Sequence, residues 1–200
     1  GVSCNGDSDG LIDLTINGGV DNQAYIYNIN SVFNSSNIFN NISSGLYTVS
    51  AIDANGCSIF ESDILISEPT LLTSSYTQSD YNGYGVSCNG DTNGSIDITI
   101  NGGVDNQAYS YSWSNGQSTE DINNLGVGSY TVTTSDVNGC TTSVTATITQ
   151  PTTLTSSYTQ SDYNGYGVSC NGDSDGSIDL TVNGGIDNQA YSYSWSNGQS

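Results

Sequence analysis

Apolar and polar residues alternate along several short runs of this chain, which is the period of a β-strand with one buried and one wet face. In the middle of the chain these runs carry Ile, Leu, Val, Tyr or Trp opposite Ser, Thr or Asp, and they cover residues 72–76, 95–100, 108–113, 129–134 and 143–149. Asn-Gly and Gly-Gly pairs separate the runs and predict turns. No segment has helical periodicity, so the pattern predicts an all-β chain.

The same residues return at a fixed spacing along the chain. GVSCNGDSDG begins at Gly1, returns as GVSCNGDTNG at Gly85, and returns again at Gly167, so the copies start 84 (85 − 1) and 82 (167 − 85) residues apart. Two longer stretches are identical between copies: residues 72–91 with 154–173, and residues 106–118 with 188–200. Self-similarity at one period predicts a tandem array of structural units.

Prolines at equivalent positions predict the boundaries of these units. Glu68-Pro69 and Gln150-Pro151 lie 82 residues apart (151 − 69), and proline suits a stiff joint that ends a strand. We therefore expect three repeats: residues 1–68, with the start of the unit missing, residues 69–150, which form a complete unit, and residues 151–200, with the end missing. Five to seven short strands in about 82 residues are typical of a small Ig-like β-sandwich, so we predict a tandem array of such sandwiches.

Composition excludes most kinds of chemistry. The 200 residues contain no Lys, Arg or His and 20 Asp plus Glu, for a formal charge of −20. Without the commonest general bases and amine nucleophiles, we do not expect an enzyme. A polyanion without cations is repelled by nucleic acid and by anionic lipid, and no apolar run approaches the roughly 18 residues that span a membrane. We expect a soluble, acidic, extracellular chain that neither binds nucleic acid nor inserts into a membrane.

Five cysteines follow the repeat. An early cysteine precedes the first clear strand of each unit (Cys4, Cys88 and Cys170), and a late cysteine precedes the last strand (Cys57 and Cys140), 53 (57 − 4) and 52 (140 − 88) residues further on. We expect disulfides within each repeat, Cys4 with Cys57 and Cys88 with Cys140, and a partner for Cys170 outside the chain; free buried thiols are the alternative. Closing such a loop contributes about 4 kcal/mol in the chain-entropy model and fits an oxidising compartment. No basic residue is present to activate a catalytic cysteine.

The residues after each early cysteine have the spacing of the first part of a calcium loop, with oxygen side chains at positions 1, 3, 5 and 9 and Gly at position 6. The candidate ligands are Asn5, Asp7, Asp9 and Asp13, then Asn89, Asp91, Asn93 and Asp97, then Asn171, Asp173, Asp175 and Asp179. Position 12 holds Ile16, Ile100 or Val182 where an EF-hand needs Glu, so the EF-hand interpretation fails. A looser calcium site stays open beside the favoured alternative, an Asx-rich turn whose Asp side chains cap backbone N–H groups.

Aromatic residues mark two places in the repeat. The Tyr-Asn-Gly-Tyr loops near the joints contain Tyr81, Tyr84, Tyr163 and Tyr166. These tyrosines either pack against the neighbouring repeat, which we favour, or offer a surface to a ligand. Tyr109, Tyr111 and Trp113 share one strand face, which predicts a sandwich core more simply than a platform for stacking on sugars.

The ordered motifs of the middle repeat resemble a known family. CNGDTNGSIDITINGG (88–103), YSYSWSNGQSTEDINNLGVGSYTVTTSDVNGC (109–140) and ATITQP (146–151) resemble the SprB repeat of giant surface adhesins in gliding Bacteroidetes, and more distantly PKD-type Ig-like modules. The first repeat departs from the pattern, because residues 24–30 lack the Trp and the WSNG turn. The resemblance implies export by type IX secretion, a position at the cell surface, attachment to outer-membrane gliding machinery, and adhesion to external surfaces or polysaccharide.

Two functions from different classes remain. A row of disulfide-closed sandwiches joined by Pro-containing links is expected to form a structural stalk of an adhesin, with neighbouring repeats of the same chain as the first partners. The alternative is a multivalent carbohydrate-binding array, in which loop and strand aromatics of each repeat hold a sugar and avidity multiplies the weak sites. Glycoside hydrolysis by paired carboxylates is not expected, because solvent-facing Asp residues offer no raised pKa.

Overall fold

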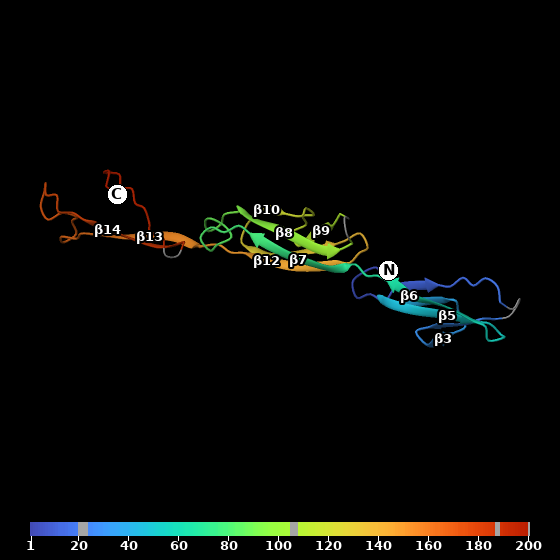
Figure 1. The fold of residues 1–200 in the computed structure, drawn as a ribbon. Coiled ribbons are helices and arrows are strands. Elements are labelled where there is room, and N and C mark those ends of the chain that lie inside the picture. Colours follow the sequence, from blue (N-terminus) through green and yellow to red (C-terminus); the bar gives the residue numbers. More distant parts are fainter. Residues whose placement is uncertain (20–23, 105–107, 187–188, 200) are drawn as a thin grey trace. The chain divides into compact units, whose positions relative to one another are not determined.

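The computed structural model describes residues 1–19, 24–104, 108–186 and 189–199, and these residues form fourteen β-strands and no helix (Figure 1). The strands are β1 Gly10–Asp13, β2 Ile26–Ile29, β3 Val32–Asn34, β4 Ile38–Ile42, β5 Gly45–Ile52, β6 Ser58–Ile66, β7 Thr70–Gln78, β8 Gly94–Gly103, β9 Ser110–Trp113, β10 Ile122–Leu125, β11 Gly128–Ser135, β12 Thr141–Ile148, β13 Thr152–Gln160 and β14 Ile178–Gly185. In this described part of the chain, no helix is long and apolar enough to cross a membrane. The predicted all-β class is confirmed.

The strands divide into two compact units. Unit 1 contains Gly1–Ser75, Ile98–Glu120 and Val132–Val144, and unit 2 contains Tyr76–Asp97, Asp121–Thr131 and Thr145–Ser200. The division cuts the strands β7, β8, β11 and β12 of the middle repeat. Each unit therefore contains one of the two expected proline joints, Pro69 in unit 1 and Pro151 in unit 2. The repeat boundaries at these prolines stay a prediction.

The first repeat, in unit 1, has a four-stranded sheet in the order β3-β2-β5-β6 and a two-stranded sheet of β1 and β4. All neighbours pair antiparallel (Figure 1). The buried core of this repeat consists of Val2, Ile12, Phe39, Ile42, Val49 and Ile66. Asn30 and Ser31 link β2 to β3 with φ of 44° and 70°, the two positive φ angles of a type I′ hairpin turn. This hairpin is what the first repeat has in place of the WSNG turn.

The middle repeat has two three-stranded sheets, β10-β8-β7 and β12-β11-β9. Contacts inside each unit show that the sheets face one another. In unit 1, the Ser74 hydroxyl of β7 lies 3.3 Å from the Thr142 hydroxyl of β12. In unit 2, a Cβ atom at Gly94 of β8 would lie 3.2 Å from a methyl group of Ile148 in β12. The predicted architecture of small Ig-like β-sandwich repeats is confirmed.

The five runs of alternating residues in the middle repeat correspond to β7, β8, β9, β11 and β12. The alternation did not predict β10, because this strand contains a β-bulge. Ile122 and Leu125 are both buried although they lie three residues apart, and the pairing with β8 shifts between Asn123 and Leu125. Asn124 carries the bulge with φ of 57°, and Asn41 in β4 repeats it at the same φ. An extra residue moves the next side chain to the other face, so the period of two is lost.

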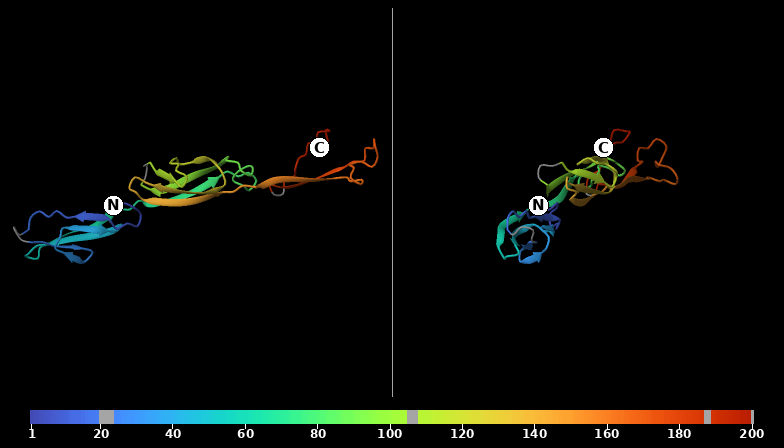
Figure 2. Two further views of the ribbon diagram at one scale, coloured as in Figure 1. Left: turned by 180° about the vertical axis from the view of Figure 1, so that it is seen from behind. Right: turned by 90° about the vertical axis from the view of Figure 1, so that its right-hand side faces the viewer.

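The third repeat, in unit 2, is described as an antiparallel pair of β13 and β14, with Tyr158 opposite Leu180 (Figure 2). β13 follows Pro151 as β7 follows Pro69. The strand pair therefore repeats the β7–β8 neighbours of the middle repeat.

The bulge predicts a selective effect of substitution at Asn124. Asn124→Val places a β-branched residue at positive φ and is expected to lower the free energy of unfolding by about 1–2 kcal/mol, whereas Asn124→Gly is expected to be neutral. Denaturant unfolding of the full chain measures both. Asn123→Val, at the neighbouring exposed position of the same strand, is the control, with an expected change below about 0.5 kcal/mol; an equal loss from both valines would contradict the role of the backbone angle.

Candidate functional site

The structure bonds an early cysteine to the late cysteine of the next repeat. The sulfur atoms of Cys4 and Cys140 are bonded, with Cα atoms 5.6 Å apart, and both residues belong to unit 1. Cys57, Cys88 and Cys170 are free and exposed. The predicted pairings of Cys4 with Cys57 and of Cys88 with Cys140 are therefore wrong.

The length of a strand explains why the pairing within the first repeat fails. The early-cysteine loop lies at the joint, since Val2 N–H donates to Ser67 O at 2.9 Å. Cys57 lies at the opposite end of β6, which runs for nine residues from Ser58 to Ile66. At about 3.3 Å per residue, this strand is roughly 30 Å long, whereas a disulfide holds Cα atoms at most about 7 Å apart. The two cysteines of one repeat thus lie at opposite ends of its sandwich.

In the early-cysteine loop, carboxylates accept hydrogen bonds from the loop itself. Ser3 N–H donates to Asp9 Oδ1 and Ser3 O–H donates to Asp7 Oδ2, both at 2.9 Å. Asp13, the last candidate ligand of this copy, instead accepts from Asn37 Nδ2 at 2.9 Å. Of these contacts, the bond from Ser3 N–H to Asp9 is the kind that the Asx-rich-turn interpretation predicts, an Asp side chain that caps a backbone N–H.

The second copy makes the same contacts with one amide in place of a carboxylate. Ser87 N–H donates to Asn93 Oδ1 at 3.2 Å, and Ser87 O–H donates to Asp91 Oδ2 at 2.6 Å. Hydrogen bonds from Ser169 to Asp173 and Asp175 repeat the arrangement in the third copy. The position that alternates between Asp and Asn is thus a hydrogen-bond acceptor in every copy.

The remaining candidate calcium ligands make other contacts or are exposed. Asn5 and Asn89 reach the joints, as described below, and Asp97 and Asp179 are exposed on β8 and β14; Asn171 is also exposed. Among the residues that the structure describes, no three His, Cys, Asp or Glu side chains gather as a metal site. The calcium site stays a prediction.

The joint carries the same two hydrogen bonds at both prolines. In unit 1, Asn5 Nδ2–H donates to Pro69 O at 3.1 Å and Gly6 N–H donates to Glu68 Oε2 at 2.8 Å. The equivalent bonds in unit 2 run from Asn89 to Pro151 O at 3.0 Å and from Gly90 to Gln150 Oε1 at 2.9 Å. Each early-cysteine loop is therefore fixed to the link that leads into the next repeat.

A buried carboxylate holds the late cysteine. Asp136 is 6% exposed; its Oδ1 accepts from Asn138 N–H at 3.0 Å and Cys140 N–H at 2.9 Å, and its Oδ2 accepts from Val104 N–H at 3.1 Å. The sequence patterns described above do not single out this residue. Its signal is the shared pattern Asp-x-Asn-Gly-Cys at residues 53–57 and 136–140.

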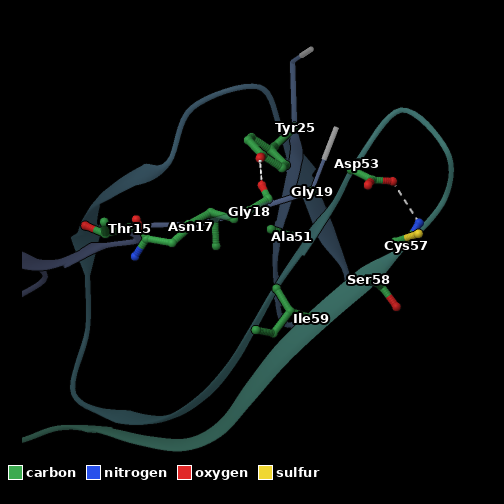
Figure 3. Close-up of a pocket in the computed structure, with 11 residues that line it drawn as sticks. Thr15, Asn17, Gly18, Gly19, Tyr25, Ala51, Asp53, Cys57, Ser58 and Ile59 are labelled. Atoms are coloured by element: carbon green, nitrogen blue, oxygen red, sulfur yellow. Dashed lines mark hydrogen bonds between the residues drawn. The ribbon is translucent and has the colours of Figure 1, made fainter. Parts of the chain in front are cut away.

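Asp53 holds the late cysteine of the first repeat in the same way. Its Oδ1 accepts from Asn55 N–H at 2.9 Å and, as Figure 3 shows, from Cys57 N–H at 2.8 Å. Beside this turn lies a hollow of about 350 Å³, lined also by Tyr25 and Gly18, and Figure 3 shows the Tyr25 hydroxyl donating to Gly18 O. The chain has no Lys, Arg or His, and the ionisable side chains that line the hollow are the Asp53 carboxyl, the Cys57 thiol and the Tyr25 hydroxyl.

The loop tyrosines brace their own loops. Backbone bonds join Tyr81 and Tyr84 across an Asn-Gly turn, and the Tyr81 hydroxyl donates to Asn93 O of the early-cysteine loop at 3.3 Å. Tyr163 and Tyr166 form the same bridge, and Tyr166 is 73% exposed. Of the two roles we considered, packing on the neighbouring repeat and ligand binding, these contacts test neither.

Hydrogen bonds lower the pKa of two of the loop carboxyls. The hydroxyl and the backbone N–H of Ser3 lower the pKa of Asp9 below the ordinary value of 3.8, and Ser169 does the same for Asp175. A carboxyl with a lowered folded-state pKa stabilises the fold above its ordinary pKa, and this contribution is lost as the pH falls through the lowered value.

We predict that the early-cysteine loops loosen only below about pH 4. In a carboxyl-carbon NMR titration of the full chain, Asp9 and Asp175 are expected to titrate below 3.8. Ser3→Ala removes the hydroxyl and is expected to raise the midpoint of Asp9, with Asp175 as the internal control. A midpoint of Asp9 that Ser3→Ala leaves unmoved would refute the assigned cause.

Removing the buried acceptor of the late turn is predicted to be costly. Asp136→Ala leaves three backbone N–H groups without their acceptor and is expected to lower the free energy of unfolding by about 2–4 kcal/mol. Asp97→Ala removes an exposed carboxylate of the same charge and is expected to change it by less than about 0.5 kcal/mol. Denaturant unfolding of the full chain separates the two, and equal losses would contradict the assigned role.

The segments that are similar to a known family begin at the early-cysteine loops. The family model of the SprB repeat matches residues 2–32, 86–118 and 168–200, each match starting just before an early cysteine. No curated protein matched the chain. A solved structure, the amphioxus IgVJ-C2 molecule, is 15% identical, with 72% of this chain and 98% of that chain covered at a TM-score of 0.34. These three segments are thus similar to the SprB repeat, which indicates a repeat segment of a surface adhesin.

Proposed function

We propose that this chain is a stalk segment of a giant cell-surface adhesin filament and that it carries tension between the cell and an external surface during gliding. The similarity of three segments to the SprB repeat supports the adhesin class. The observation that carries the mechanical role is the disulfide that crosses the joint at Pro69, from Cys4 in the first repeat to Cys140 in the second. This disulfide joins two repeats covalently. A disulfide within one repeat would leave the backbone link at Pro69 as the one covalent connection between them.

The position of the disulfide determines which residues can extend when tension is applied to the chain. Cys4 and Cys140 are 136 residues apart in sequence, so nearly all of the first repeat, the β6–β7 link and most of the middle repeat lie inside the closed loop. Tension applied at the two ends of the chain passes through the sulfur–sulfur bond and bypasses this loop. In the chain-entropy model the same closure stabilises the fold by about 5 kcal/mol.

Export and attachment complete the proposal. By resemblance to the family, the chain reaches the surface by type IX secretion and is held by outer-membrane gliding machinery. An oxidising environment outside the cytoplasm is what a structural disulfide needs, and the bond of Cys4 with Cys140 supports such a location.

The alternative function, a multivalent carbohydrate-binding array, has less support from the described geometry. Trp113 is 4% exposed and its indole N–H donates to Thr119 O at 2.9 Å, so this residue is part of the core and offers no face to a sugar. The Tyr109 hydroxyl donates to Gly102 O at 2.7 Å. The loop tyrosines remain the candidates for this alternative, with Tyr166 the most exposed of them.

Single-molecule pulling of the full chain from its two ends tests the mechanical role. With the disulfide intact, the loop between Cys4 and Cys140 is expected to stay closed. Reductant is expected to release roughly 450–490 Å of further extension, because 136 residues extend by about 3.3–3.6 Å each. Cys4→Ser is expected to give the long extension without reductant, and Cys57→Ser, at a free cysteine, is expected to change nothing.

Two outcomes would count against the stalk. Full extension of the oxidised chain would show that the disulfide does not limit its length. Binding of the oxidised full chain to a glycan array, abolished by Tyr81→Ala together with Tyr84→Ala, would favour the carbohydrate-binding array instead.

A further inference from the structure

We propose that the early cysteine of every repeat is bonded to the late cysteine of the repeat that follows, so that overlapping disulfides run along the array, and that Cys57, Cys88 and Cys170 each form one half of such a bond. This inference concerns the covalent structure and does not rest on the proposed function. The one disulfide in the described residues supplies the pattern, because it joins an early cysteine, Cys4, to the late cysteine of the next repeat, Cys140.

The surroundings of the early cysteine are the same at both joints. Asn5 and Asn89 both donate to a proline carbonyl oxygen, at 3.1 and 3.0 Å. Gly6 and Gly90 both donate to the side chain that precedes this proline, at 2.8 and 2.9 Å. The backbone bond that closes the turn, from Asp7 N–H to Cys4 O, has its counterparts from Asp91 to Cys88 and from Asp173 to Cys170, all at 3.1 Å. Cys88 is therefore held on its joint as Cys4 is held on the first.

The surface beside each early cysteine is built from equivalent residues. The hollow at Cys4 is lined by Thr70, Leu71 and Leu72 of β7 and by the late turn, Gly139 to Thr141. The hollow at Cys88 has a volume of about 460 Å³ and is lined by Thr152, Thr153 and Leu154 of β13, the strand equivalent to β7. By equivalence with the hollow at Cys4, we infer that the late-cysteine turn of the repeat that contains β13 fills the hollow at Cys88.

The turn that carries the late cysteine has the same hydrogen bonds in the first and the middle repeat. Asp136 and Asp53 accept from the N–H of the late cysteine at 2.9 and 2.8 Å, and the residue two positions before it donates to the same oxygen at 3.0 and 2.9 Å. In the bonded pair, Asn138 Nδ2–H of this turn also donates to Ser3 O at 2.9 Å, beside the disulfide. Asn55 occupies the same place before Cys57. The turn that carries Cys57 therefore has the same hydrogen bonds as the turn that carries Cys140, and we expect it to contact the early-cysteine loop of a preceding repeat in the same way.

Formation of each bond needs an oxidant, for which a thiol–disulfide oxidant is sufficient. The thiolate of the early cysteine attacks the oxidant's disulfide and forms a mixed disulfide, and one oxidant sulfur leaves as a thiolate. The thiolate of the late cysteine then attacks the mixed disulfide at the early-cysteine sulfur and displaces the second oxidant sulfur. Two thiols of the protein lose two protons and two electrons, and the oxidant is reduced to a dithiol.

The test uses the sequence identity between repeats. Because residues 188–200 are identical to residues 106–118, a copy of residues 119–150 appended after Ser200 continues the third repeat in register. In this extended chain, oxidised and digested with Asp- and Glu-specific proteases, mass spectrometry is expected to find Cys4 bonded to Cys140 and Cys88 bonded to the appended copy of Cys140. Thiol titration is expected to count two free thiols, Cys57 and Cys170.

Matched variants distinguish this pattern from the alternatives. Cys88→Ser in the extended chain is expected to raise the count to three free thiols, whereas Cys170→Ser is expected to lower it to one and leave the new bond in place. A bond between the appended cysteine and Cys170, or a free Cys88 beside a free appended cysteine, would overturn the proposal.

A mirror extension tests the other half and guards against a misfolded appendage. A copy of residues 1–84 placed before Gly1 continues in register, since Gly85 repeats Gly1. In that chain the early cysteine of the added copy is expected to bond to Cys57, and Cys57→Ser is expected to free it. A Cys57 that stays reduced while Cys4 and Cys140 are bonded would overturn the proposal for the late cysteine.

Discussion

The carboxylates and the turns of this chain need hydrogen-bond donors, and no cationic side chain is available to supply them. None of the 200 residues is Lys, Arg or His, so ion pairs between side chains are excluded and the acceptors have to find N–H and O–H donors. Asp136 shows the result, a buried carboxylate that accepts from three backbone N–H groups. A buried charge is tolerated when hydrogen bonds replace its hydration. The turns that carry the cysteines are built on this interaction, so the disulfide depends on it as well.

What these positions require is an acceptor rather than a charge. Asn93 takes the place of Asp9 and still accepts from the serine N–H, and Gln150 takes the place of Glu68 and still accepts from the glycine N–H. An amide oxygen has the same geometry as a carboxylate oxygen but no charge for salt to screen. The repeated joint is therefore held by directional hydrogen bonds, and the remaining negative charge is left on the surface, where it keeps chains apart.

Periodicity in the sequence predicted which residues are equivalent, and this was sufficient for the all-β class, the sandwich and five strands of the middle repeat. It did not predict β10, because Asn124 inserts one residue into the alternation. It also gave the wrong cysteine pairs, because equivalence identifies an early and a late cysteine but does not say which copies meet. That choice depends on β6, whose nine residues separate Cys57 from the joint. Asp136 was missed because an acid before Asn-Gly is also typical of an exposed turn.

The overlap of the proposed disulfides changes how far an array can lengthen. Cys4 and Cys140 are 136 residues apart, more than the 82 residues of one repeat (167 − 85), so successive bonds overlap over 52 residues (140 − 88). One covalent path runs through the bond of Cys4 with Cys140, along the backbone from Cys140 to Cys170, and into the proposed bond of Cys170, two repeats further on. This path contains only 30 backbone residues (170 − 140) for every two repeats. Fully extended, such a path measures about 100 Å, against about 560 Å for the 164 residues (2 × 82) of two unfolded repeats. Two nine-residue strands, one for each folded repeat, together measure roughly 60 Å. Disulfides between repeats thus restrict lengthening to less than about twofold even when every sandwich unfolds, a limit that disulfides within repeats could not impose on the links.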